Sequence, residues 1–114
     1  MFIFKILSQS EWNEAQKAGL FSGSFVDKKD GFIHFSNAEQ VQTTLEKHFA
    51  GQTELMLLGV DEKSLGEHLK WEVSRGGALF PHLYAPLAVD QVSFVAEITT
   101  DDIGNHVLPK LPDG

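Results

Sequence analysis

The densest group of reactive side chains lies in residues 70–84, KWEVSRGGALFPHLY. If this segment begins as a strand, Lys70, Glu72 and Ser74 project from one face, because successive side chains of a strand alternate. Glu72 is then placed to act as a general base or to accept hydrogen bonds from sugar hydroxyls. The spacing alone favours a simpler interpretation, an exposed ion pair between Glu72 and a lysine or arginine, which would contribute little to stability.

Arg75 follows directly and precedes two glycines, which let the backbone come close to a ligand. Its guanidinium offers two parallel hydrogen bonds to a phosphate or a carboxylate. A hairpin turn with a solvated arginine explains the same residues and is slightly favoured. Arg75 is therefore a candidate ligand for an anion, with the plain turn as the alternative.

Ring side chains complete the segment. His82 and Tyr84 are two residues apart, so a strand presents both on one face. They form either the wall of a pocket or a sheet face packed on the core. Trp71 has the same two interpretations, and core packing is preferred for it.

A second candidate, His34, lies in the stretch DGFIHFS, residues 30–36. Residues 32–35 predict a short buried strand, and Ser36 with Glu39 matches a capping box at the start of a helix. The free N–H groups and dipole of such a helix favour an anion beside the strand end, where Ser36 would add a hydroxyl. A buried histidine bonded to a backbone carbonyl is an equally good interpretation of His34.

Several kinds of reactive site have no matching motif. The chain has no cysteine, and its five histidines form neither an HxH nor an HExxH pair, so we expect no metal site. The sequences GxSxG, GxGxxG and the phosphate-binding P-loop are also absent. This removes the commonest hydrolase, dinucleotide-binding and nucleoside-triphosphatase interpretations.

The elements that must position these side chains follow from periodicity and turn residues. Helices come early and strands late, which favours a single α+β domain over residues 1–100. The polar, proline-bearing residues 101–114 predict a loosely held tail. Residues 20–30, rich in glycine, serine and charge, predict a loop. The pattern predicts strands at 2–7, 32–35, 54–61, 69–73, 82–87 and 92–98, and helices that begin at Ser8–Glu11 and Ser36–Glu39 and end at Gly19 and Gly51.

Composition narrows the partners. The formal net charge is −7, which opposes binding to phosphate backbones, so we do not expect a nucleic-acid partner. No run approaches the roughly 20 apolar residues that a membrane span needs, so we expect no membrane partner either. The absence of cysteine suits a reducing cytoplasm, which is the location we expect.

Two stretches carry a resemblance to a known family. The pattern GLFSGS…D..DGFIHFS, followed by LKWE.SRGGALFPHLYAPL, closely resembles the small bacterial family called domain of unknown function 952, over about residues 3–95. This family is in turn similar to the ADP-ribosyltransferase fold, in particular to the tRNA 2′-phosphotransferase branch, which uses NAD. In that branch a helix with a tryptophan and a Gly-Leu ending precedes a strand reading HVHLS; Trp12, Gly19–Leu20 and 32–36 match that order.

The resemblance implies a fold and a set of roles. It implies two small, mostly antiparallel sheets that form a cleft, with two short helices in the N-terminal half. His34 and Ser36 would line a nicotinamide–ribose pocket. Lys5 would take the place of the first-strand histidine or arginine that bonds ribose hydroxyls, and Glu72 is the candidate for the catalytic glutamate.

Two hypotheses about function follow. In the first, the chain is an enzyme of the transferase or glycohydrolase kind that uses NAD or an ADP-ribose compound as a substrate, without a tightly bound cofactor. In the second, the same scaffold is a non-catalytic module that binds a nucleotide or another small anion. The candidate residues are Glu72 and His34 for catalysis, and Lys5, Ser36, Trp71, Arg75, His82 and Tyr84 for ligand binding.

Overall fold

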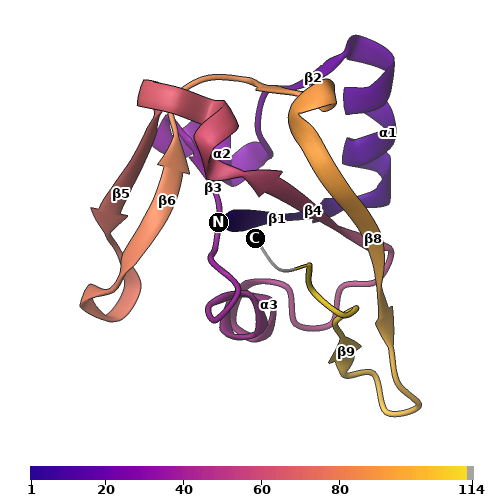
Figure 1. The fold of residues 1–114 in the computed structure, drawn as a ribbon. Helices are drawn as coiled ribbons and strands as arrows, with labels where there is room; N and C mark the ends of the chain where they lie inside the picture. Colours follow the sequence, from indigo (N-terminus) through magenta and orange to yellow (C-terminus); the bar gives the residue numbers. More distant parts are fainter. Residues whose placement is uncertain (113–114) are drawn as a thin grey trace.

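A four-stranded antiparallel sheet forms the centre of the molecule (Figure 1). The computed structural model describes residues 1–112, apart from the side chain of Arg75. The strands of the central sheet, in spatial order, are β1 (Phe2–Ser8), β4 (Leu55–Asp61), β8 (Val92–Thr100) and β9 (His106–Val107). Strands β1 and β4 pair over their whole length, so that Lys5 lies opposite Leu58.

A smaller three-stranded sheet carries most of the candidate residues. Its strands, in spatial order, are β3 (Ile33–His34), β6 (Leu79–Leu83) and β5 (Leu69–Val73). A third pair is formed by β2 (Leu20–Phe21) and β7 (Leu87–Ala88). Within residues 1–112 every strand pairing is antiparallel, but there are three sheets, whereas the family resemblance implied two.

The helices are short and lie in the first half of the chain, which confirms the α+β class. They are α1 (Gln9–Ala18), α2 (Phe25–Asp30) and α3 (Val41–His48), with 3-10 turns at Glu62–His68, Arg75–Gly77 and Val89–Gln91. In residues 1–112 no helix has the length and apolar character that crossing a membrane requires.

The first helix forms as the sequence predicts. The Ser8 hydroxyl accepts from the N–H of Glu11, and the Glu11 carboxylate accepts from the N–H of Ser8. Gly19 ends the helix with φ of 84°, a left-handed conformation that glycine adopts without a steric cost.

Other predicted boundaries were wrong. Residues 20–30 are not a loop, because they contain β2 and α2. Ser36 does not cap α3: its N–H and C=O both bond to Phe4, which ties this part of the chain to β1. The reciprocal pair of side-chain bonds forms one residue later, between Asn37 and Gln40. Helix α3 also ends at His48, before Gly51, and the strand expected at 82–87 is divided between β6 and β7.

The central sheet has an apolar core on each face. On one face Phe4 and Ile6 pack with residues of α3, and the partly buried Leu108 and Leu111 lie against the same group. On the other face Ile3 and Leu7 pack against α1 and the smaller sheet. Lys5 falls between Ile3 and Leu7 in the alternation, so its side chain enters this second core and is only 5% exposed.

The assignment of the core on the α3 side of the sheet can be tested at Leu57. This side chain is fully buried in the cluster that contains Phe4 and Ile6, so we expect Leu57→Ala to lower the free energy of unfolding by about 2–5 kcal/mol through lost burial and a residual cavity. The matched control is Leu79→Ala, because Leu79 is 51% exposed and should cost less than half as much. Equal losses in urea unfolding would contradict the assignment of Leu57 to the core.

Candidate functional site

One face of the smaller sheet gathers four ring side chains. His34 on β3 lies directly opposite His82 on β6, and their ring centroids are 5.7 Å apart. Phe32, which immediately precedes β3, stacks on His82 with a centroid distance of 4.0 Å and an interplanar angle of 25°. The Tyr84 ring is 5.3 Å from Phe32. We call Phe32, His34, His82 and Tyr84, with Glu72, the aromatic face.

Glu72 links the two rings on the β6 side of this face. Its Oε1 accepts a hydrogen bond from the Tyr84 hydroxyl at 2.6 Å and a second from His82 Nδ1 at 2.8 Å. These two bonds, the one from Tyr84 first, lower the pKa of the Glu72 carboxyl, and the same contact raises the pKa of Tyr84. The face therefore holds an ionised carboxylate in a fixed position beside stacked rings.

His82 is the most deeply buried member of the aromatic face, at 5% exposure. Its Nδ1 faces Glu72, and its Nε2 makes no hydrogen bond to any residue in the described part of the chain. That part also contains no buried side-chain nitrogen or oxygen without a partner. It follows that Nε2 reaches the surface, although the rest of the ring is enclosed.

Asp27 on α2 organises the other side of the face. Its carboxylate is 2% exposed and accepts from Lys5 Nζ at 2.8 and 3.0 Å, one contact to each oxygen. It also accepts from the backbone N–H of Ser24 at 2.9 Å and from that of His34 at 3.1 Å. We call Lys5, Asp27 and His34 the Asp27 cluster; it joins β1, α2 and β3.

The imidazole of His34 is held at both ring nitrogens. Nδ1 lies 2.6 Å from Asp27 Oδ1, and Nε2 lies 2.9 Å from Asp30 Oδ2, at the end of α2. Carboxylates only accept, so both contacts are satisfied when both ring nitrogens carry hydrogen. His34 thus has no ring nitrogen left for a ligand unless it releases Asp27 or Asp30.

In the Asp27 cluster, burial and neighbouring charges shift the pKa values of Asp27 and Lys5 in opposite directions. Burial by itself would raise the pKa of Asp27, but the hydrogen bond from His34 and the charge of Lys5 hold it well below its usual range. Burial lowers the pKa of Lys5, and the Asp27 carboxylate works against that shift. The pair is stable as an ion pair because each partner supplies the charge that the other needs.

The structure brings together some of the candidate residues and separates others. His34, Glu72, His82 and Tyr84 share the aromatic face, and Lys5 reaches it only through Asp27. The Lys5 ammonium is paired with a carboxylate, and the residue is 95% buried, so it is not presented to a ribose hydroxyl in this conformation.

Three further candidates lie elsewhere. The Ser36 hydroxyl is buried and bonded to Thr44 Oγ1 at 3.0 Å, so it ties the segment after β3 to α3. Trp71 alternates with Glu72 and packs against the core on the opposite face of the sheet. Core packing was the interpretation that the sequence favoured for this residue. The side chain of Arg75 lies outside the described residues, and its role stays a prediction.

Sequence reasoning missed Asp27, Asp30 and Phe32. The two aspartates lie in the stretch VDKKD, which has the composition of a solvated loop, and α2 is too short at six residues to show helical periodicity. The available signal was the spacing D..DG directly before FIHF, which places two carboxylates one helical turn apart ahead of a histidine.

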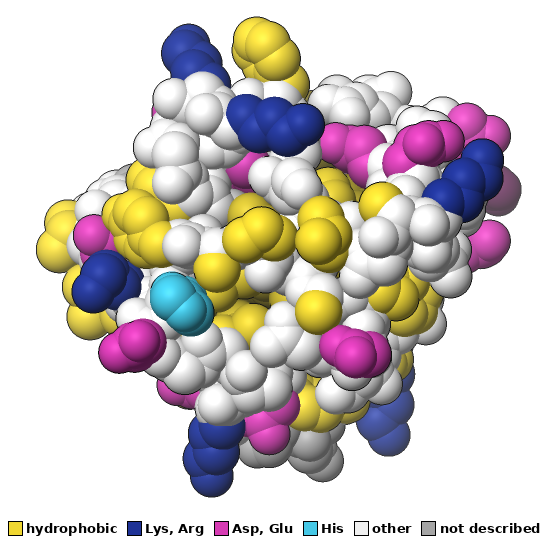
Figure 2. Space-filling model, turned by 90° about the horizontal axis from the view of Figure 1, so that it is seen from above, with side chains coloured by type: hydrophobic (Ala, Val, Ile, Leu, Met, Phe, Trp, Pro, Cys, Tyr) yellow, Lys and Arg dark blue, Asp and Glu magenta, His cyan; other side chains and the backbone are white. Residues whose placement is uncertain are grey.

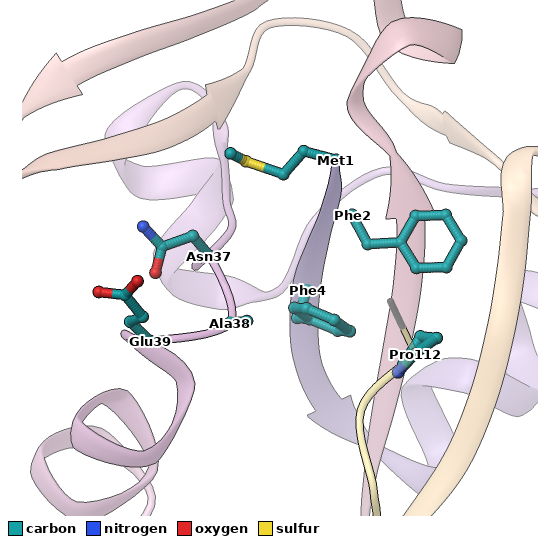
Figure 3. Close-up of a pocket in the computed structure, with 7 residues that line it drawn as sticks. All are labelled: Met1, Phe2, Phe4, Asn37, Ala38, Glu39 and Pro112. Atoms are coloured by element: carbon teal, nitrogen blue, oxygen red, sulfur yellow. The ribbon is translucent and has the colours of Figure 1, made fainter. Parts of the chain in front are cut away.

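Two hollows lie away from the aromatic face. The first, of about 180 Å³, is formed by Met1, Phe2, Phe4, Asn37, Ala38, Glu39 and Pro112, and the apolar side chains of β1 point into it (Figure 3). The second lies between Gln9, residues 53–55 and the end of β8. Seen from above, the molecule has hydrophobic side chains gathered in the middle of the visible face, with charged side chains around them (Figure 2). Neither hollow contains a candidate residue, and in residues 1–112 no three His, Asp or Glu side chains are arranged to hold a metal ion.

A family model and several solved structures match this chain. The family model described as Protein of unknown function (DUF952) matches residues 6–95. The chain is similar to the crystal structure of CC0527 from Caulobacter crescentus, with 52% identity, a TM-score of 0.90 and 94% of each chain covered. It is also similar to the solution NMR structure of CC0527, with 54% identity, a TM-score of 0.81 and coverage of 90% of this chain and 89% of that one. No curated protein matches the chain.

The Asp27 cluster can be tested by removing one charge. Asp27→Asn keeps the shape of the side chain but leaves the buried Lys5 ammonium without its counter-charge, so we expect a loss of about 3–5 kcal/mol in the free energy of unfolding. Asp30→Asn is the matched control, because the Asp30 side chain is 42% exposed and its loss should cost less than about 1 kcal/mol. Similar urea midpoints for the two variants would contradict the role given to Asp27.

The depressed pKa of Asp27 also predicts how the free energy of unfolding depends on pH. The pKa of Asp27 is depressed in the folded chain, so its contribution is fully present above the ordinary value of 3.8 and is lost as the pH falls below it. We expect the free energy of unfolding to decrease between about pH 4 and about pH 2, and to decrease less steeply in Asp27→Asn. Parallel curves for the two proteins in urea titrations would exclude Asp27 as the source.

Proposed function

The chain belongs to the family described as Protein of unknown function (DUF952), and we propose that it is an enzyme that cleaves the nicotinamide–ribose bond of NAD or of a related ADP-ribose compound. The reaction takes place on the aromatic face. The observation that carries the proposal is the ionised Glu72 carboxylate, held by Tyr84 and His82 beside a stack of rings.

The chemistry of that bond suits this arrangement. Cleavage develops positive charge on the ribose, in a state that resembles an oxocarbenium ion, and a fixed carboxylate stabilises such charge. Tyr84 and His82 keep Glu72 in one orientation, so it does not need to reorganise as the charge forms. Glu72 has a second oxygen, Oε2, that makes no hydrogen bond to the described residues and is available to the substrate.

The rings supply a place for the leaving group. The nicotinamide ring of NAD is a flat cation, and aromatic faces attract such cations at separations of up to about 6 Å. The Tyr84 side chain is 41% exposed beside Phe32, so a ring surface is available at the edge of the stack.

A second candidate function is binding without catalysis. It is favoured by one observation: Lys5, to which the resemblance gives the ribose hydroxyls, is occupied by Asp27. A chain of this kind would hold a nucleotide on the aromatic face and leave its glycosidic bond intact. The two functions differ in the release of nicotinamide, which can be measured directly.

The test combines binding and turnover. We expect NAD to raise the melting temperature, since a ligand at a hundredfold excess over its Kd stabilises the folded state by about 2.7 kcal/mol. Incubation with NAD should release nicotinamide. Glu72→Gln should lower kcat by at least about a hundredfold and leave the NAD-dependent thermal shift unchanged, because the amide keeps the shape but not the charge.

The matched control is Glu97→Gln, on the exposed side of β8 in the other sheet, which should leave both readouts as in the parent chain. A thermal shift without nicotinamide release would favour the binding module. If neither NAD nor ADP-ribose changes the melting temperature, both candidate functions are wrong.

A further inference from the structure

The two histidines of the aromatic face differ in what their ring nitrogens do. We propose that His82, oriented by Glu72, is the general base that takes a proton from the attacking water or hydroxyl, an inference that rests on the function proposed above. His34, by contrast, is a positioning residue. The difference follows from the hydrogen bonds of each ring, which can be followed atom by atom.

Glu72 determines which nitrogen of His82 carries a hydrogen. Nδ1 lies 2.8 Å from Glu72 Oε1, and an ionised carboxylate only accepts, so Nδ1 donates. In a neutral imidazole the other nitrogen, Nε2, is then bare and has a lone pair to accept a proton. This is the arrangement in which a carboxylate orients a histidine base.

Nε2 is also the part of the ring that a substrate can reach. It has no partner among residues 1–112, and no buried polar side-chain atom in that part of the chain is unpaired, so it faces solvent. The rest of the ring is fixed, because the His82 side chain is 6% exposed and stacks on Phe32 at 4.0 Å. A base held this firmly presents its lone pair in one direction.

The charged and titratable groups around His82 come from three strands. Glu72 and Lys70 lie on β5, with Lys70 directly opposite His82; His34 faces it from β3; and Tyr84 follows β6. Of these, Glu72 alone is hydrogen-bonded to the His82 ring. The orientation of the His82 ring is therefore set by one carboxylate within hydrogen-bonding distance and by the stacking of Phe32.

His34 cannot serve in the same way. Its Nδ1 and Nε2 are both within 2.9 Å of carboxylates, so it would have to break a contact with Asp27 or Asp30 before it accepted a proton. Its role is to hold β3 against α2, opposite His82. The sequence interpretation assigned catalysis to His34 and ligand binding to His82; the hydrogen bonds favour His82 as the base and His34 as a positioning residue.

The step balances without any further reactant. The C–N bond between ribose and nicotinamide breaks, and nicotinamide leaves with the bonding electron pair as a neutral ring. The oxygen of water, or of an acceptor hydroxyl, forms a new bond to the same ribose carbon. Its proton passes to His82 Nε2 and then to solvent, which leaves ADP-ribose or an ADP-ribosylated acceptor.

The test compares His82→Asn with the parent chain, using NAD as the probe and nicotinamide release as the readout. Asparagine can still donate to Glu72 from the position of Nδ1, but it has no proton acceptor in the position of Nε2. We expect kcat to fall by about 10²–10⁴-fold with little change in KM or in the thermal shift by NAD. His48→Asn, an exposed histidine change on α3, should leave turnover unchanged.

The pH dependence of kcat/KM distinguishes a general base from a structural residue, because a purely structural role of His82 would not change the shape of the profile. In the parent chain, log(kcat/KM) should fall towards acid with a slope of one, and His82→Asn should lack this limb. Turnover in His82→Asn with its acid limb intact would overturn the inference and leave the proposed function standing. Absence of nicotinamide release from the parent chain would overturn both.

The tautomer of His82 provides a measurement that needs no variant. In ¹⁵N NMR spectra at alkaline pH we expect the proton on Nδ1 and a bare Nε2. A proton on Nε2 would overturn the inference even if His82→Asn failed to fold.

Discussion

The structure depends on one buried charge. Lys5 occupies a position in β1 where the alternation of the strand demands an apolar side chain, between Ile3 and Leu7. A buried ammonium without a counter-charge is strongly destabilising, so the fold must place a carboxylate next to Lys5 Nζ. Asp27 meets that requirement from a helix of six residues, and the geometry of the whole α2–β3 segment follows from where the carboxylate must lie.

The same carboxylate orders the aromatic face. Asp27 holds the backbone and the ring of His34, and His34 lies opposite His82 in the neighbouring strand. The face is therefore built from two carboxylate–histidine pairs with different exposure, one closed at both ring nitrogens and one open at Nε2. This asymmetry separates a ring with both nitrogens hydrogen-bonded from one whose Nε2 has no partner among the described residues.

Local patterns predicted much of this arrangement. The short strand at FIHF follows from its run of apolar residues. The common face of Lys70 and Glu72, and that of His82 and Tyr84, follow from the two-residue period, which is a local property. The α+β class and the first capping box are confirmed by the structure. Asp27 was missed because its partner Lys5 lies 22 residues away, and only tertiary packing shows that the lysine is buried. The predicted cap at Ser36 was wrong because the backbone N–H and C=O of Ser36 are hydrogen-bonded to Phe4 in β1.

The backbone bridge between Ser36 and Phe4 limits how the aromatic face could be grafted onto another protein scaffold. The chain leaves the smaller sheet after His34 and bonds through Ser36 to the middle of β1, with N···O distances of 2.7 and 2.9 Å. The segment that carries His34 is thus anchored in the central sheet two residues further on. A graft of 24–36 onto another scaffold would lack both the lysine and the strand to which it is fastened, so the smallest portable unit is discontinuous and includes β1.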